Sequence, residues 1–194
     1  MRRRFSGRET LAAIVALLLT LTAQTAIGDS SPIPAGVQMR LFSKIWMFDR
    51  SLAGNDEIVM AILYQSTFRT SAETKDRLID AVRGGGFKIR CIPVPLDDLD
   101  GVSTALQSVN ADVFYVTEMR GINISDIVGV SRARRIKTIT VVSAYVQGGV
   151  AISLRVRNDK ADIVVNLSAA KTEGSDLTAQ LLRVATLIGE PAPQ

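Results

Sequence analysis

The chain has 194 residues, a formal net charge of +4 at pH 7, no histidine and one cysteine. The absence of histidine excludes Ser–His and Cys–His nucleophile pairs and removes the commonest zinc ligand and the commonest general base. The single cysteine, Cys91, cannot form an internal disulfide. We interpret it as a small buried apolar residue, and a redox role or an intermolecular disulfide is the alternative.

Residues 1–28 have the three-part layout of a secretory signal peptide. Four arginines precede an apolar run over residues 11–21, and small residues follow as far as Gly28. We expect cleavage after Gly28, which predicts a periplasmic location for the mature protein. A retained membrane anchor is the alternative, but the apolar run is shorter than the ~20 residues that a transmembrane helix needs. We therefore expect no stable membrane span after cleavage.

Removing residues 1–28 takes away four basic residues and one acidic residue, so 19 basic and 18 acidic residues remain and the net charge becomes +1. The calculated isoelectric point of about 9.5 is therefore mostly a property of the N-terminal segment. Aromatic residues make up only 5% of the chain, and no stripe of Lys and Arg is interleaved with them. We expect no binding to nucleic acid.

Residues 29–36 are rich in Ser, Pro and Gly, which predicts a flexible tether, and a single domain is expected over residues 37–190. Apolar residues at intervals of three and four predict an amphipathic helix over residues 37–52. We interpret Asp49 and Arg50, near its end, as a helix-terminal ion pair or cap. A helix that precedes the main pattern of strands and helices is also a natural docking surface, so a partner-facing role for both residues is the alternative.

The middle of the chain alternates between strand and helix patterns. Strands are predicted over residues 57–64, 87–92, 112–117 and 138–142, and helices over 70–83, 99–109 and 123–135. This alternation indicates parallel βαβ units. Strands 112–117 and 138–142 are apolar and β-branched nearly throughout, so we expect them at the centre of the sheet. The fold class is therefore a three-layer α/β domain with a mostly parallel sheet, either flavodoxin-like or similar to one lobe, that is one half, of a periplasmic binding protein.

Two polar segments within this alternation invite a chemical interpretation. Gly84–Gly86 follows a helix and precedes a strand, the reverse of a phosphate-binding loop, so we interpret it as a helix C-terminal cap. Asp97, Asp98 and Asp100 are interpreted as an acidic helix start, and a calcium or magnesium site is the alternative. We expect no metal ion and no cofactor.

The last third of the chain predicts a hairpin followed by a helix. A loop at Gln147–Gly149 precedes a half-buried strand over residues 150–156, and a tight turn leads to a second strand over 161–166. The hairpin leaves no room for a helical crossover, so we expect it to add antiparallel strands at one edge of the sheet. Apolar residues at helical spacing from Leu177 to Ile188 predict a C-terminal helix.

From Gly148 to Ala185 the motifs follow the order Gly-Gly, strand, turn, strand, Asn-Leu-x-Ala-Ala, short spacer, Leu-Leu-Arg-Val-Ala. This order resembles the end of the YfiR family of small exported proteins, and the resemblance extends over residues 38–188. The spacer departs from the family at Ser175 and Asp176, where at least one apolar residue is expected. These are packing motifs, so they indicate ancestry and fold and name no chemistry.

The resemblance to the YfiR family implies a non-enzymatic periplasmic regulator. Such a protein binds and restrains the periplasmic sensor part of an inner-membrane signalling protein, typically a diguanylate cyclase, and thereby affects cyclic di-GMP and biofilm behaviour. Some YfiR-like proteins use paired cysteines, which this chain lacks, so a redox-sensing function is not carried over.

In an open parallel sheet, ligands collect beyond the carboxyl ends of the strands. We therefore expect a candidate surface for a ligand or partner there, made of Thr117, Glu118, Arg120, Tyr145, Gln147, Gly148 and Gly149. Ordinary polar loops are one alternative. Another is a periplasmic small-molecule binding module that presents a ligand to a transporter or sensor, and its single lobe would need a partner or a homodimer to enclose that ligand. An envelope hydrolase would require a mechanism without histidine.

Overall fold

The computed structural model describes residues 33–98, 100–158 and 160–189. The expected signal peptide and the first half of the expected tether lie outside these residues. The second half of the tether is already part of the fold, because Ile33 packs in the core and the first described helix begins at Ala35. Within the described ranges, no helix is both long enough and apolar enough to cross a membrane.

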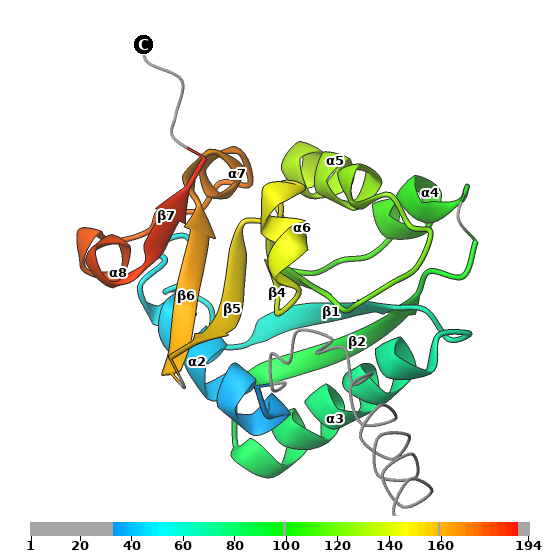
Figure 1. The fold of residues 1–194 in the computed structure, drawn as a ribbon, viewed down its shortest axis with the longest axis horizontal. Coiled ribbons are helices and arrows are strands. Elements are labelled where there is room, and N and C mark those ends of the chain that lie inside the picture. Colours follow the sequence, from blue (N-terminus) through cyan, green and yellow to red (C-terminus); the bar gives the residue numbers. More distant parts are fainter. Residues whose placement is uncertain (1–32, 99, 159, 190–194) are drawn as a thin grey trace, which may run out of the picture. The chain divides into compact units, whose positions relative to one another are not determined.

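The strands form one seven-stranded sheet with the order β2-β1-β3-β4-β5-β6-β7 (Figure 1). Their bounds are β1 Ile58–Tyr64, β2 Ile89–Pro95, β3 Val113–Val116, β4 Lys137–Thr140, β5 Ile152–Arg157, β6 Lys160–Asn166 and β7 Thr186–Ile188. The first five strands in this order are parallel, and β6 runs antiparallel to β5. The order 2-1-3-4-5 is that of flavodoxin-like doubly wound sheets, so the predicted fold class is confirmed.

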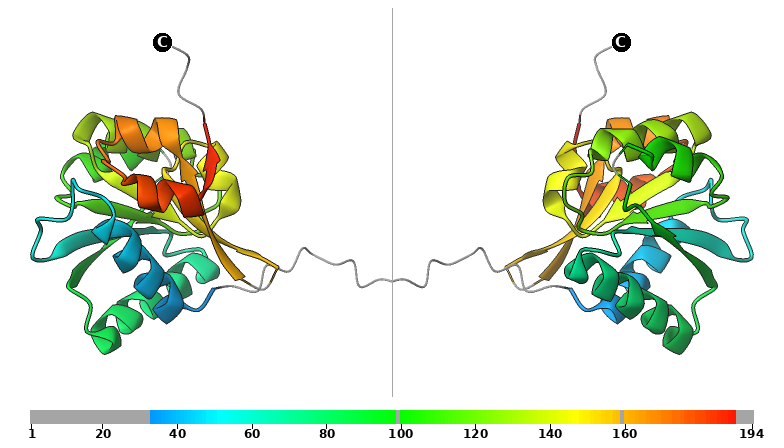
Figure 2. Two further views of the ribbon diagram at one scale, coloured as in Figure 1. Left: turned by 90° about the vertical axis from the view of Figure 1, so that its left-hand side faces the viewer. Right: turned by 90° about the vertical axis from the view of Figure 1, so that its right-hand side faces the viewer.

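Helices cover both faces of the sheet, as Figure 2 shows for α2 and α3 on one side and α4 and α5 on the other. The helix bounds are α2 Ala35–Met47, α3 Arg69–Gly85, α4 Val102–Gln107, α5 Ile124–Arg134, α6 Ser143–Gln147, α7 Leu167–Thr172 and α8 Ala179–Val184. Successive side chains of β1 point to opposite faces of the sheet and pack in two different hydrophobic clusters. Met60 and Ile62 pack in the cluster with α2 and α3, whereas Ala61 and Leu63 pack in the cluster with α4 and α5.

Helix α2 is fixed to the central strand β3 by an aromatic contact and a buried hydrogen bond. The Phe42 and Tyr115 rings meet edge to face with centroids 6.1 Å apart. The Tyr115 hydroxyl donates to Gln38 Oε1 at 2.6 Å, and Gln38 Nε2 donates to the Ile33 carbonyl at 2.6 Å. Burial of the hydroxyl raises the pKa of Tyr115, so it stays protonated as a donor. The helix ends at Met47, five residues before the predicted end at residue 52.

The glycine cap is confirmed, but the acidic helix start is wrong. Gly86 ends α3 in the left-handed conformation with φ of 65°, which glycine adopts without strain. Helix α4 begins at Val102, and its first turn contains no acidic residue. Asp97 instead accepts hydrogen bonds from Ser66. Among the described residues, no group of three His, Cys, Asp or Glu side chains is placed to hold a metal ion.

The end of the chain differs from the predicted hairpin and single helix. Helix α7 begins directly after β6, because the Asn166 side chain accepts a hydrogen bond from the Ala169 amide at 3.0 Å and caps it. Helix α8 ends at Val184, where Ala185 turns extended, and residues 186–188 form β7 parallel to β6. The outer strand on this side is therefore β7. The hairpin strands lie inside it, and Ala151 and Ser153 are as fully buried as their apolar neighbours.

Candidate functional site

Thr117 lies at the carboxyl end of β3, and its side chain points into the protein. The side chain is only 1% exposed. Its hydroxyl donates to the Leu63 carbonyl at 2.8 Å and lies 2.6 Å from the Ser71 hydroxyl, which in turn accepts from the Gln65 amide at 2.9 Å. This chain of hydrogen bonds joins the ends of β1 and β3 to the first turn of α3. Thr117 therefore supports the candidate surface from below.

Gln65, directly after β1, fixes the loop that follows β3. It is 6% exposed. Its side-chain amide forms two hydrogen bonds with the Arg120 backbone, one as donor and one as acceptor. The Arg120 amide donates to Gln65 Oε1 at 2.6 Å, and Gln65 Nε2 donates to the Arg120 carbonyl at 2.8 Å. Sequence reasoning missed this role, although a polar residue at the end of an apolar strand was the available signal.

Tyr145 holds the same loop from the other side. Its hydroxyl accepts from the Met119 amide at 3.0 Å and donates to the Met119 carbonyl at 3.1 Å. The backbone of residues 119–120 is thus bound by two side chains from two different elements. We call residues 65–68, Asp97, residues 117–121 and Tyr145 the rim.

The exposed part of the rim carries a negative and a positive side chain. Glu118 and Arg120 are exposed, and the Arg120 guanidinium carbon lies 4.3 Å from the centroid of the Phe68 ring. Asp97 closes the rim toward β2, because its carboxylate accepts from the Ser66 amide at 2.7 Å and from the Ser66 hydroxyl at 2.6 Å. The hydrogen bond from the Ser66 side chain holds the pKa of Asp97 below its usual value. The rim is therefore a preformed polar surface.

Gln147 is the last residue of α6, and Gly148 and Gly149 lie against α5. The predicted loop contains helix α6, and after it Ile152 of β5 pairs with Ile139 of β4. Gly149 has a φ of 105°, and a Cβ there would lie 2.9 Å from Arg132 Nη2. Tyr145 is the residue after β4 whose side chain, among those described, binds the loop of residues 117–121, through Met119.

Asp49 and Arg50 point in different directions and do not pair with each other. Asp49 is 2% exposed, and its Oδ1 accepts from the Ser51 amide at 3.0 Å, the Ser51 hydroxyl at 2.7 Å and the Asp176 amide at 2.9 Å. Arg50 is exposed and lies 3.4 Å from the Asp176 carboxylate. Asp49 and Leu177 also form an isolated β-bridge. Asp49 thus binds the end of α2 to the segment before α8, and only Arg50 is available to a partner.

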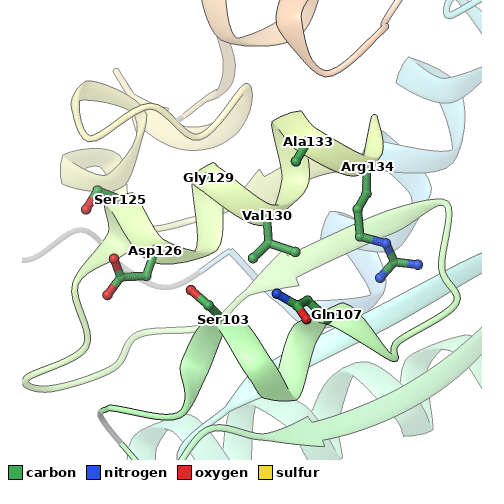
Figure 3. A pocket seen from close by; sticks show the side chains of 8 residues that line it. All are labelled: Ser103, Gln107, Ser125, Asp126, Gly129, Val130, Ala133 and Arg134. Carbon is green, nitrogen blue, oxygen red and sulfur yellow. The ribbon is translucent and has the colours of Figure 1, made fainter.

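A shallow groove between α4 and α5 is lined by none of the predicted site residues (Figure 3). Its lining residues are Ser103, Gln107, Ser125, Asp126, Gly129, Val130, Ala133 and Arg134. Figure 3 shows Asp126 and Arg134 at opposite ends of the groove. Arg134 Nη1 donates to the carbonyls of Leu106 at 2.8 Å and Val109 at 2.7 Å, so this guanidinium serves to fix the end of α4.

The partly buried Cys91 and the buried Glu173 are ionisable groups that lie away from the rim. Cys91 on the edge strand β2 packs against the core, and burial raises the pKa of its thiol to about 11. A thiol that stays protonated is a poor nucleophile, which supports its interpretation as a packing residue. Glu173 at the end of α7 is fully buried and accepts hydrogen bonds from Ser131 and Thr138. Sequence reasoning missed Glu173, because nothing in its local sequence marks it as buried.

Solved structures share the fold of this chain at low sequence identity. A conserved domain protein from Vibrio cholerae is 16% identical with a TM-score of 0.61, over 79% of this chain and 60% of its own. CD0873, a substrate-binding protein with adhesive properties from Clostridium difficile in its ligand-free open form, is 14% identical with a TM-score of 0.64, over 80% of this chain and 60% of its own. An ABC domain from Streptococcus pneumoniae in complex with L-Trp is 12% identical with a TM-score of 0.60, over 80% of this chain and 62% of its own.

This chain therefore spans about 60% of the length of these solved relatives. No curated protein matches the sequence. The sequence profile of the YfiR/HmsC-like family, in contrast, matches residues 51–186, from the end of α2 to the start of β7. That range contains the rim, the buried Glu173 and the motifs that carry the sequence resemblance. The chain belongs to the YfiR/HmsC-like family.

Proposed function

We propose that this chain is a non-enzymatic periplasmic regulator that binds the periplasmic sensor part of an inner-membrane signalling protein, a diguanylate cyclase, and restrains it. The observation that carries the proposal is membership of the YfiR/HmsC-like family over residues 51–186. Restraint of such a cyclase would link envelope conditions to cyclic di-GMP and biofilm formation.

The geometry of the rim supports a role in protein binding. The polar side-chain groups of Gln65, Thr117 and Tyr145 are used in hydrogen bonds within the rim and to the strands beneath it. A loop that is already held in one conformation loses little entropy when it binds, which favours recognition by a fixed surface. Arg120 stands over the Phe68 ring and presents a planar guanidinium, and arginine is enriched among the residues that dominate binding energy at interfaces. We place the partner contact at Glu118 and Arg120, with Arg50 as a second contact.

Crosslinking in the cell envelope, followed by affinity purification of this protein, tests the proposal. The expected dominant partner is an inner-membrane protein with a cytoplasmic cyclase domain, and Arg120→Glu should reduce its recovery at least tenfold. Lys88→Glu is the matched control, because this exposed lysine precedes β2 at the amino end of the sheet. Deletion of the gene should change cellular cyclic di-GMP. An unchanged level under several envelope stresses, with no cyclase recovered, contradicts the proposal.

A small-molecule binding module is the second candidate. It is favoured by the shared fold with CD0873, described as a substrate-binding protein, and with a domain solved in complex with L-Trp. A ligand at the rim should raise the melting temperature of the purified protein, and Arg120→Ala should abolish that increase. A screen of amino acids and nucleotides in which no compound changes the melting temperature contradicts this candidate.

A further inference from the structure

Glu173 is a carboxylate enclosed by four elements of the fold. It follows α7 and is 0% exposed. Its Oε2 accepts from the Thr138 amide of β4 at 2.8 Å, and its Oε1 accepts from the Thr138 hydroxyl at 2.6 Å and from the Ser131 hydroxyl of α5 at 3.1 Å. The Thr138 hydroxyl in turn accepts from the Ala151 amide at 2.8 Å, next to β5. Glu173 thus joins α5, β4, β5 and α7.

This cluster satisfies both protonation states of the carboxyl group. The Ser131 hydroxyl has one hydrogen and two acceptors in reach, the Val128 carbonyl at 2.9 Å and Glu173 Oε1 at 3.1 Å. When Glu173 is ionised, that hydrogen turns to the carboxylate. When Glu173 takes up a proton on Oε1, the new O–H donates to Ser131 Oγ, and the Ser131 hydrogen turns to Val128. Only hydrogens move, and the hydrogen bond between Ser131 and Glu173 is kept in both states.

The charges around Glu173 are basic. Arg132 on α5 attracts the ionised carboxylate. Arg135, at the end of α5, lies against the turn after Glu173, and Lys137 of β4 places Nζ 3.5 Å from the Arg135 carbonyl. Lys171 of α7 is exposed. Next to β5, the uncharged Ala151 amide is the group that contacts the cluster, through the Thr138 hydroxyl. Ionisation is therefore opposed by burial and favoured by Arg132 and the hydrogen bonds.

Burial outweighs the other effects and raises the pKa of Glu173 to about 7, although hydrogen bonds from Thr138 and Ser131 and the charge of Arg132 act to lower it. The chain contains no histidine, so no imidazole titrates near neutral pH. Burial also places the pKa of Cys91 far above this range. The buried Glu173 therefore changes its protonation state near neutral pH.

We propose that Glu173 is a proton-binding site that makes the junction of α5, β4, β5 and α7 more stable as the pH falls through the neutral range. This proposal is independent of the proposed partner. In the unfolded chain the carboxyl has its ordinary pKa near 4.5, below that of the folded state. The stabilisation by the bound proton is therefore complete below about pH 4.5, and it is lost as the pH rises through about 7.

Chemical denaturation of the protein purified from the envelope fraction, at pH values from 5 to 8 and constant ionic strength, tests this inference. The unfolding equilibrium constant of the wild type should rise roughly 70-fold across this range because of Glu173. Glu173→Gln imitates the neutral carboxyl and should remove most of this rise, with stability at pH 8 equal to or above that of the wild type. Glu118→Gln, which removes an exposed carboxylate of the rim, is the matched control. Its unfolding equilibrium constant should rise with pH as that of the wild type does.

Amide resonances of the wild type give a second readout that does not depend on the variant folding. The Thr138 and Ala151 amides should shift with a common midpoint near pH 7, because both belong to the hydrogen-bonded cluster. In Glu173→Gln these shifts should disappear. Resonances that do not move between pH 5 and 8, or a pH dependence of unfolding that survives in Glu173→Gln, would overturn the proposal.

Discussion

Tyr145 binds both backbone groups of Met119 with one hydroxyl, at 3.0 Å to the amide nitrogen and 3.1 Å to the carbonyl oxygen. Met119 belongs to the loop after β3 and Tyr145 to helix α6 after β4. One phenol therefore satisfies a donor and an acceptor that the loop could not satisfy by itself. The position of Arg120, the next residue, depends on this contact.

Tyr145→Phe should loosen the rim while keeping the ring in the core. Two backbone groups of Met119 lose their partner, which should cost about 1–2 kcal/mol of unfolding free energy. Chemical denaturation measures this loss, and hydrogen exchange should become faster at residues 119–121. Tyr64→Phe is the control, since the Tyr64 ring lies under Lys75 and its hydroxyl has no partner among the described residues. Equal exchange rates in Tyr145→Phe and the wild type would contradict this role.

Gln65→Ala should destabilise the fold by about 2 kcal/mol, because it leaves the partly buried amide and carbonyl of Arg120 without the Gln65 side chain as partner. Recovery of the envelope partner should fall together with stability, since Arg120 then lacks a fixed backbone. Gln107→Ala, at an exposed position of α4, should change the unfolding free energy by less than about 0.5 kcal/mol. Similar losses in the two variants would show that the pairing with Arg120 contributes little.

Gly149→Ala and Gly129→Ala should act in opposite directions. Gly149 has a φ of 105°, which alanine adopts only with strain, and the new Cβ would lie 2.9 Å from Arg132 Nη2. The unfolding free energy should therefore fall by about 1–3 kcal/mol. At Gly129, inside α5, a Cβ meets nothing within 4 Å, and alanine should raise stability by about 0.5–1 kcal/mol. Thermal and chemical denaturation of both variants measure the signs. A neutral Gly149→Ala would argue against the close packing of this turn on α5.

Asp49→Ala should release the end of α2 from the segment before α8. The amides of Ser51 and Asp176 and the Ser51 hydroxyl lose their acceptor, at a cost of about 2–3 kcal/mol. Limited proteolysis should then cut near residues 48–52 faster than in the wild type. Asp56→Ala, at an exposed position, is the control and should leave the cleavage rate unchanged.

The elements with long and regular patterns were predictable from the sequence. Strands β3 and β4 were expected at the centre because both faces of each are apolar, and both lie there. The end of the chain was harder, because the apolar residues between Leu177 and Ile188 fit a helical spacing over a short distance. Only the six residues of α8 are helical, and β7 exists because its residues find an open edge at β6, which is a long-range contact.

The part of the candidate surface that follows β4 was harder to place for a similar reason. The short helix α6 turns the chain within five residues, and the Val150 amide donates to the Tyr145 carbonyl at 3.0 Å, so Gly149 faces α5. The roles of Gln65 and Glu173 depend on partners 55 and 35 residues away, respectively, and such pairs leave no local pattern. Glu118 and Arg120 were predictable because they directly follow a strand whose end the sequence defines.

The residues after α2 are hydrogen-bonded to segment 176–178, which is synthesised much later than α2. The Arg50 amide donates to the Asp176 carbonyl at 3.0 Å, and the Thr178 amide donates to the Phe48 carbonyl at 2.9 Å. The first described helix therefore obtains closing contacts from a segment that is synthesised 127 positions after Asp49. A ribosome that stops before residue 176 releases a chain whose buried carboxylate at Asp49 has lost a donor, and such a fragment is a natural target for proteolytic quality control.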